Sequence, residues 1–141
     1  MKVLPHVIRN INEFNIPAGD LYGYAILYFG VNLILMFDYR LSFDIEVKNS
    51  DEPIQVLIIS RKSVPAWKEK NFTDKQSSGF EVYYNNRGIK FNDVFRPSVS
   101  DAYAFILNNR LSDFKEIKTL EVTLNHNWQQ EVTESQLKDR E

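Results

Sequence analysis

The sequence contains no cysteine, and this absence excludes several kinds of site at once. A chain without cysteine forms no disulfide, has no thiol nucleophile and cannot build a Cys-based zinc site. Glycine is also scarce, and the five glycines do not have the spacing of a phosphate-binding loop. No serine stands in a Gly-x-Ser-x-Gly nucleophile elbow. The sequence therefore predicts neither a disulfide framework nor one of these common catalytic motifs.

Histidine is nearly absent too, since only His6 and His126 occur. Neither has a second histidine, a nucleophile or an acidic cluster beside it in the sequence, as a metal ligand or a catalytic base would require. Most acidic residues alternate with apolar ones, which is typical of a solvated strand face. We therefore expect no enzyme activity, no metal and no cofactor. A carboxylate that meets either imidazole in space would favour an enzyme instead.

Charge of one sign is lacking as well, because 17 Lys and Arg stand against 19 Asp and Glu. A balanced domain has no bulk attraction for nucleic acid, so we expect no nucleic-acid partner. A secretory signal is also lacking, because Pro5 and His6 interrupt the short apolar stretch at residues 3–8 and no small-residue cleavage pattern follows. This favours the cytoplasm, although the sequence does not fix the compartment.

What the sequence does contain is typical of one β-rich domain. Its 141 residues include ten Phe and seven Tyr, and aromatic residues are enriched in strands. A chain of this length buries roughly two-thirds of its unfolded surface without needing disulfides or metal ions. We expect a single domain at residues 1–128 and a charged tail at 129–141. Thr133 and Gln136 have capping-box spacing, so a helix could begin in the tail.

Four stretches have the periodicity of β-strands. Residues 40–48 and 119–125 alternate between apolar and polar side chains, which predicts strands with one solvated face. Residues 54–60 and 102–107 are apolar at nearly every position, which predicts strands covered on both faces. The sequence therefore places at least two strands in the interior of stacked layers.

Turn signals separate the strands. Asn85-Asn86-Arg87-Gly88, between predicted strands at 80–84 and 89–95, predicts a hairpin turn with positive φ angles. Asn108-Asn109 has the same turn chemistry. No connection has room for the crossover helix of a parallel sheet. The predicted fold class is all-β: an antiparallel, jelly-roll-like β-sandwich of about eight strands, with one short helix in the 61–79 connection.

Residues 21–37 pass without a charge, and two interpretations apply. Seventeen such residues reach the lower end of the roughly 17–25 that a membrane-spanning helix needs. Gly23, Gly30 and Asn32, with many aromatic and β-branched neighbours, favour two buried strands joined near residues 30–32. We expect the two strands, and membrane association remains the alternative.

The connection at residues 61–79 differs in kind from the rest of the chain. Ser63 and Pro65 predict a short helix that runs to about residue 70. Five bases against two acids surround Trp67. One interpretation is a binding loop, in which the aromatic anchor and a basic rim meet an acidic partner, a sugar or a lipid headgroup. The other is a solvated connection whose Trp caps one end of the sandwich. The predicted binding residues are Arg61, Lys62, Trp67, Lys68, Lys70, Lys75, Arg87 and Arg96.

Several short runs follow one another in an order found in a known family. They are Ile16-Pro17-Ala18-Gly19, Val47-Lys48-Asn49, and Asp101-Ala102-Tyr103-Ala104-Phe105 with Asn108-Asn109. This order resembles the GOLD (Golgi dynamics) β-sandwich over roughly residues 12–125. The resemblance implies a non-enzymatic, jelly-roll-like module that binds protein or lipid-associated partners. The chain lacks the paired cysteines of the cargo receptors in that family, so their function is not expected here.

Three functions remain open from the sequence. The first is a soluble interaction module that binds protein through the 61–79 loop. The alternative is a structural subunit that forms homo-oligomers through β-edges or an apolar patch. The third is a β-sandwich that binds a carbohydrate or a lipid headgroup. We therefore expect a protein partner or self-association.

Overall fold

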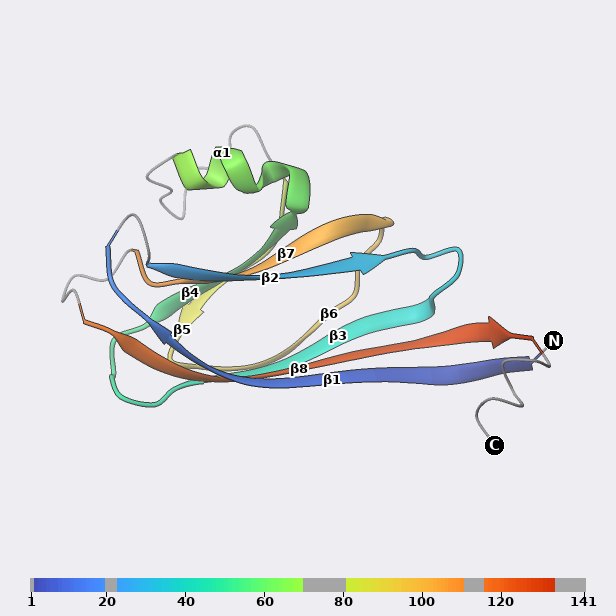
Figure 1. The fold of residues 1–141 in the computed structure, drawn as a ribbon, viewed down its shortest axis with the longest axis horizontal. Coiled ribbons are helices and arrows are strands. Elements are labelled where there is room, and N and C mark those ends of the chain that lie inside the picture. Colours follow the sequence, from blue (N-terminus) through green and yellow to red (C-terminus); the bar gives the residue numbers. More distant parts are fainter. Residues whose placement is uncertain (1, 20–22, 70–80, 111–115, 134–141) are drawn as a thin grey trace.

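The computed structural model describes residues 2–19, 23–69, 81–110 and 116–133. Within these ranges eight β-strands form two sheets, and a short helical segment lies on one of them (Figure 1). The elements are β1 (Lys2–Ile16), β2 (Tyr24–Val31), β3 (Phe37–Val47), β4 (Ile54–Ser60), a 3-10 helix (Arg61–Ser63), α1 (Val64–Glu69), β5 (Val82–Gly88), β6 (Lys90–Phe95), β7 (Asp101–Asn108) and β8 (Lys118–Val132).

The two sheets have the strand order of a jelly roll. Sheet A has the order β1-β8-β3-β6, and sheet B has the order β2-β7-β4-β5. All neighbouring strands are antiparallel. The chain changes sheet after every strand except β4, as expected for a double-sheet jelly roll of two Greek keys. The predicted antiparallel, jelly-roll-like sandwich is confirmed.

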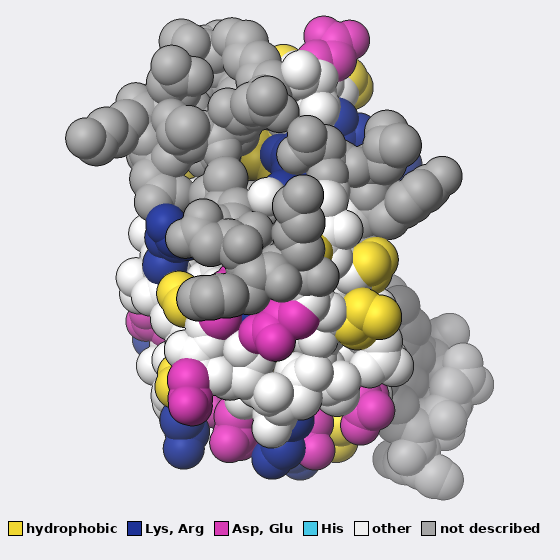
Figure 2. Space-filling model, turned by 90° about the vertical axis from the view of Figure 1, so that its left-hand side faces the viewer, with side chains coloured by type: hydrophobic (Ala, Val, Ile, Leu, Met, Phe, Trp, Pro, Cys, Tyr) yellow, Lys and Arg dark blue, Asp and Glu magenta, His cyan; other side chains and the backbone are white. Residues whose placement is uncertain are grey.

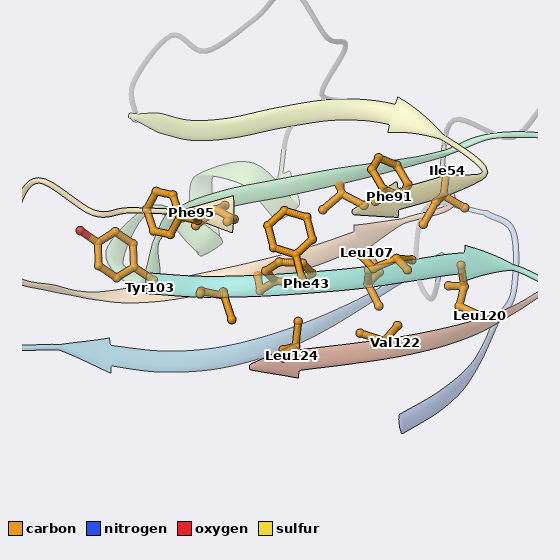
Figure 3. Packing of buried hydrophobic residues seen from close by; sticks show 14 of the residues in the cluster. Phe43, Ile54, Phe91, Phe95, Tyr103, Leu107, Leu120, Val122 and Leu124 are labelled. Carbon is orange, nitrogen blue, oxygen red and sulfur yellow. The ribbon is translucent and has the colours of Figure 1, made fainter. Parts of the chain in front are cut away.

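The main core lies between the sheets and is made by alternate residues of their strands. Leu41, Phe43 and Ile45 of β3 are buried, while the residues between them are more exposed. Tyr103 and Phe105 of β7 meet them from the other sheet, and the Phe43 and Phe105 rings are 5.1 Å apart. Figure 3 shows side chains of both sheets pointing into this space. The alternation of residues 40–48 therefore predicted the buried face correctly.

A second core lies on the outer face of sheet B and explains why β4 and β7 are buried on both faces. Leu57, Ile59, Ala104 and Ile106 point away from the main core and pack beneath Val64 and Trp67 of α1. All seven residues of β4 are buried. The predicted short helix is thus present, and it covers one face of a sheet.

Two sequence predictions about local structure are wrong. Residues 85–88 do not form a hairpin turn: they belong to β5 and pair with β4, and none has a positive φ. The chain crosses at Ile89 into β6, which pairs with β3. In the 21–37 stretch only β2 is a complete strand. The amide of Met36 bonds the carbonyl of Asn32 at 2.7 Å, which forms a turn before β3.

The C-terminal strand is longer than expected. β8 continues past residue 128 to Val132 and pairs with β1 along its whole length, from Ile16 opposite Lys118 to Lys2 opposite Val132. Residues 129–132 therefore belong to the sandwich and not to a tail. The predicted helix start near Gln136 lies outside the described residues.

Candidate functional site

Trp67, the anchor of the predicted binding loop, is not exposed. Its side chain has 0% exposed surface and packs in the second core with Val64 and Leu57. The Tyr24 ring meets it edge-on, with centroids 5.1 Å apart. The alternative interpretation of the sequence was that Trp67 covers the sandwich. The indole does so, but on the outer face of sheet B and not at one end.

Arg110, which the sequence did not single out, holds α1 in place. Its guanidinium lies 3.9 Å from the Trp67 ring centroid and 5.5 Å from that of Tyr24. It also donates to the backbone carbonyls of Trp67 and Lys68, both at 3.4 Å. These contacts satisfy carbonyls at the C-terminal end of a helix, where a cation is favourable. The surroundings of Trp67 are therefore structural.

The remaining predicted residues do not form one patch. Arg61, whose guanidinium lies 4.6 Å from the Tyr28 ring centroid, follows the end of β4. Arg87 lies opposite Gln55 at the other end of β4, about 20 Å away along the strand. Arg96 follows β6 in the other sheet. Lys62 and Lys68 are exposed, and Lys68 lies over the ring of Tyr24 and not over that of Tyr28. Lys70 and Lys75 lie outside the described residues.

The end of the sandwich seen in Figure 2 has acidic and basic side chains interspersed on its described surface. No large area of one sign is visible there. This surface therefore offers no electrostatic reason to expect an acidic partner.

The exposed apolar side chains are concentrated on β1, which is the edge strand of sheet A. Val3, Val7 and Ile11, at intervals of four residues, are 49%, 63% and 67% exposed. They share the outer face of the strand, because alternate residues of a strand point to the same side. Ile8, on the inner face, is 50% exposed. We call Val3, Val7 and Ile11 the β1 stripe.

The β1 edge is long and open. Of the described strands only β8 pairs with β1, so the backbone on its other side has no strand partner. Figure 1 shows β1 and β8 running together beyond the end of β2 and β7. Ile34 and Leu35, in the connection from β2 to β3, are also exposed at 79% and 56%. The side of the sandwich that carries β1 and β2 therefore has several exposed apolar side chains.

A cavity of about 250 Å³ opens between the edges of β1 and β2. Its walls are mainly aromatic and aliphatic, and none of the described residues that line it is an Asp, Glu, Lys or Arg. The lining residues are Ile8, Asn10, Tyr28, Phe29, Gly30, Met36, Tyr39, His126 and Trp128.

His126 and Tyr39 form the polar centre of this cavity. The Tyr39 hydroxyl lies 2.5 Å from Nδ1 of His126, and a hydrogen bond joins them. Burial lowers the pKa of His126, and burial together with the charge of Tyr103 raises that of Tyr39. Both groups are therefore neutral near pH 7. No Asp or Glu is among the residues that line this cavity.

His6 has an aromatic neighbour in the same region. Its ring stacks on Trp128 with centroids 5.4 Å apart and an interplanar angle of 8°. Within the described residues no group of three His, Cys, Asp or Glu side chains is placed to hold a metal ion. No helix among those residues is long and apolar enough to cross a membrane.

Comparison with known proteins gives a likeness of fold. No family model and no curated protein matches the sequence. A solved structure from Bacillus endospore appendages, described as a family of disulfide-linked pili, aligns with a TM-score of 0.50. The two sequences are 11% identical, and the alignment covers 91% of this chain and 92% of that chain. At this identity the likeness supports the β-sandwich fold alone.

Proposed function

We propose that this chain is a structural subunit that associates with copies of itself through the open edge at β1. The observation that carries the proposal is the β1 stripe, because Val3, Val7 and Ile11 are each about half exposed or more on a strand that no described strand pairs on its outer side. Soluble proteins usually shorten, charge or cover such edges, since an open strand pairs readily with another chain. A 15-residue edge with an apolar stripe is suited to that pairing.

The similar solved structure gives limited support for assembly. It belongs to proteins described as disulfide-linked pili, so a protein of similar fold can serve as a building block. This chain contains no cysteine. Its self-association would therefore depend on backbone pairing and apolar contacts, which makes it reversible and dependent on concentration.

The experiment is sedimentation velocity over a wide range of protein concentration. We expect the natural chain to sediment as a larger species as its concentration rises. Val7→Lys combined with Ile11→Lys should keep it monomeric at least tenfold further up the concentration range, because two charges would be placed in the contact. Both side chains are largely exposed, so the fold should tolerate these changes.

Val94→Lys is the matched control. Val94 is 45% exposed and lies on β6, the edge strand at the opposite side of sheet A. The same new charge on that edge should leave the association unchanged. A natural chain that remains monomeric at every concentration would contradict the proposal.

A second candidate is protein binding through the 61–79 connection. The exposure of Arg61, Lys62 and Lys68 supports it, whereas the buried Trp67 supplies no surface anchor. The GOLD resemblance, the binding of a carbohydrate or lipid headgroup and the absence of enzyme activity stay predictions. Charge reversal at Lys62 and Lys68 together should reduce capture of an acidic partner without affecting self-association.

A further inference from the structure

We propose that two copies pair β1 with β1 in antiparallel orientation about a two-fold axis at Val7. Sheet A would then continue through the interface into the sheet A of the second copy. This inference rests on the proposed function, and it adds the partner strand and the register. Pro5 shows which backbone groups of β1 are open, and three further features favour this register.

Pro5 identifies which backbone groups of β1 face the open edge. In an antiparallel ladder, successive residues direct their N–H and C=O alternately toward one neighbour and toward the other. Pro5 lies within the unbroken pairing with β8, opposite Gln129, and proline has no N–H to donate. It fits such a strand where its nitrogen faces away from the existing partner. Residues that alternate with it, including Val3, Val7 and Ile11, therefore direct their backbone groups to the open edge.

The β1 stripe matches itself in this register. With the axis at Val7, the two Val7 side chains lie opposite each other, and Val3 of each copy lies opposite Ile11 of the other. All of these positions share the outer face of sheet A, which is kept when the axis is perpendicular to the sheet. Exposed β-branched side chains thus become cross-strand neighbours, which is the contact that stabilises paired strands.

The charges of β1 also fit. Arg9 of one copy lies opposite Pro5 of the other, and Lys2 lies opposite Asn12, so no like charges face each other. Each Pro5–Arg9 pair makes one backbone hydrogen bond where other such pairs make two, because proline has no N–H. An axis at Arg9 would place the two guanidinium groups directly opposite, which is unfavourable. An axis at Ile11 would place Val7 opposite Asn15 and leave Val3 beyond the paired region.

The cavity gives the third reason for this register. Ile8 and Asn10 line its β1 wall, and they are inner-face residues of the edge strand. In the proposed pairing, His6 of the second copy lies opposite Ile8 and Leu4 of the second copy lies opposite Asn10. These side chains would flank the mouth of the cavity and exclude water from part of its apolar wall. The second copy would therefore complete the side of the sandwich that is open in a single chain.

Single cysteines test the register directly, because the natural chain has none and any disulfide must join two copies. Paired residues have Cα atoms about 4.5–5.5 Å apart, within the range that a disulfide spans. We expect Val7→Cys to form a covalent dimer under mild oxidation. Arg9→Cys should not, because the two Arg9 positions would be about 13 Å apart along the strand. A mixture of Val3→Cys and Ile11→Cys should cross-link, although Ile11→Cys alone should not.

Val94→Cys, on the opposite edge, measures disulfides that form by random collision. Each variant is oxidised at a concentration where the natural chain associates, and its yield is compared with this background. A tenfold or greater excess for Val7→Cys would support the register. A dimer that cross-links through Arg9→Cys or Ile11→Cys instead would overturn the register and leave self-association intact. Association without a cross-link at any β1 position would show that β1 does not form the interface. A natural chain that never associates would contradict the proposed function as well.

Discussion

At the scale of single residues, His126 has a neutral side chain that the fold protects. It is 8% exposed and contacts Tyr39, Phe29 and the cavity at the β1 edge. The uncharged surroundings offer no compensation for a proton on the imidazole. Burial accordingly lowers its pKa below the ordinary value of 6.5.

This lowered pKa predicts that the folded chain loses stability in mild acid. Between the pKa of folded His126 and 6.5, the unfolded state binds more protons than the folded state, so the free energy of unfolding falls as the pH falls. The stability that neutral His126 contributes is fully present above pH 6.5. His126→Gln should make the melting temperature less dependent on pH between 7.5 and 5.5.

His6→Gln is the control for that measurement, because it removes the other histidine and leaves the Tyr39 contact in place. Melting temperatures by circular dichroism at closely spaced pH values provide the comparison. An unchanged slope in the His126→Gln variant would mean that other groups cause the acid sensitivity.

At the scale of elements, α1 is too short to be stable alone and depends on one side chain for its place on sheet B. A six-residue helix has little intrinsic stability. Trp67 is the larger of its two buried side chains and packs in one cluster with Leu57, Ile59 and Ile106 of the sheet below. Arg110 then fixes the outer side of the indole.

Trp67→Ala should therefore destabilise the whole domain, by about 3–5 kcal/mol, which is the usual cost of removing a large buried aromatic side chain. Urea unfolding followed by circular dichroism measures the change. Lys62→Ala, an exposed position in the adjoining 3-10 helix, should stay within about 0.5 kcal/mol of the natural chain. If Trp67→Ala unfolds at the natural urea concentration, the indole is not a core residue.

The strands differ in how well their sequences predicted them. The alternation in β3 and the apolar runs of β4 and β7 were sufficient, because burial on one or both faces leaves a direct mark on the residue pattern. Residues 85–88 led to a wrong prediction. Their Asn and Gly residues are typical of a turn, but here they lie in the edge strand β5. Ile34 and Leu35 were expected to be buried from their composition, and nothing local indicates that they lie in an exposed connection.

The candidate site was harder to predict than the fold for the same reason. Trp67 contacts Arg110, 43 residues away. The outer side of β1 is open because, of the described strands, only β8 pairs with β1. Within β1, Pro5 is a local sign of an edge strand, because proline cannot donate to a strand ladder. Sheet membership is set by long-range packing, so a surface defined by an unpaired edge is not visible in a local pattern.

At the scale of the whole molecule, a buried polar cluster closes one end of the sandwich. Lys118, with no exposed surface, donates to Glu52 at 2.9 Å and to Asn109 at 2.7 Å. Asn109 in turn donates to the carbonyls of Ile16 and Glu116. The start of β8, the end of β1 and the connections beside β4 and β7 are thereby joined. The Asn108-Asn109 pair, expected to be ordinary turn residues, is therefore part of the interior.

This cluster predicts a strong dependence of folding on Lys118. Lys118→Met should cost about 3–5 kcal/mol, because it leaves the mostly buried carboxylate of Glu52 without its cation. Adding Glu52→Gln should recover part of the loss, since the uncompensated charge is then removed. Urea unfolding of the natural chain, both single variants and the double variant gives the coupling energy between the two residues.

Lys48→Met is the matched control for Lys118→Met, because it makes the same substitution in an exposed ion pair. Lys48 Nζ lies 3.7 Å from carboxylates of Glu46 and Glu121, and its side chain is 41% exposed. Water screens such pairs, so the loss should be below about 1 kcal/mol. Equal losses at Lys48 and Lys118 would show that burial of the Lys118 cluster adds nothing. A much larger loss at Lys118, relieved by Glu52→Gln, would establish that the cluster holds this end of the sandwich together.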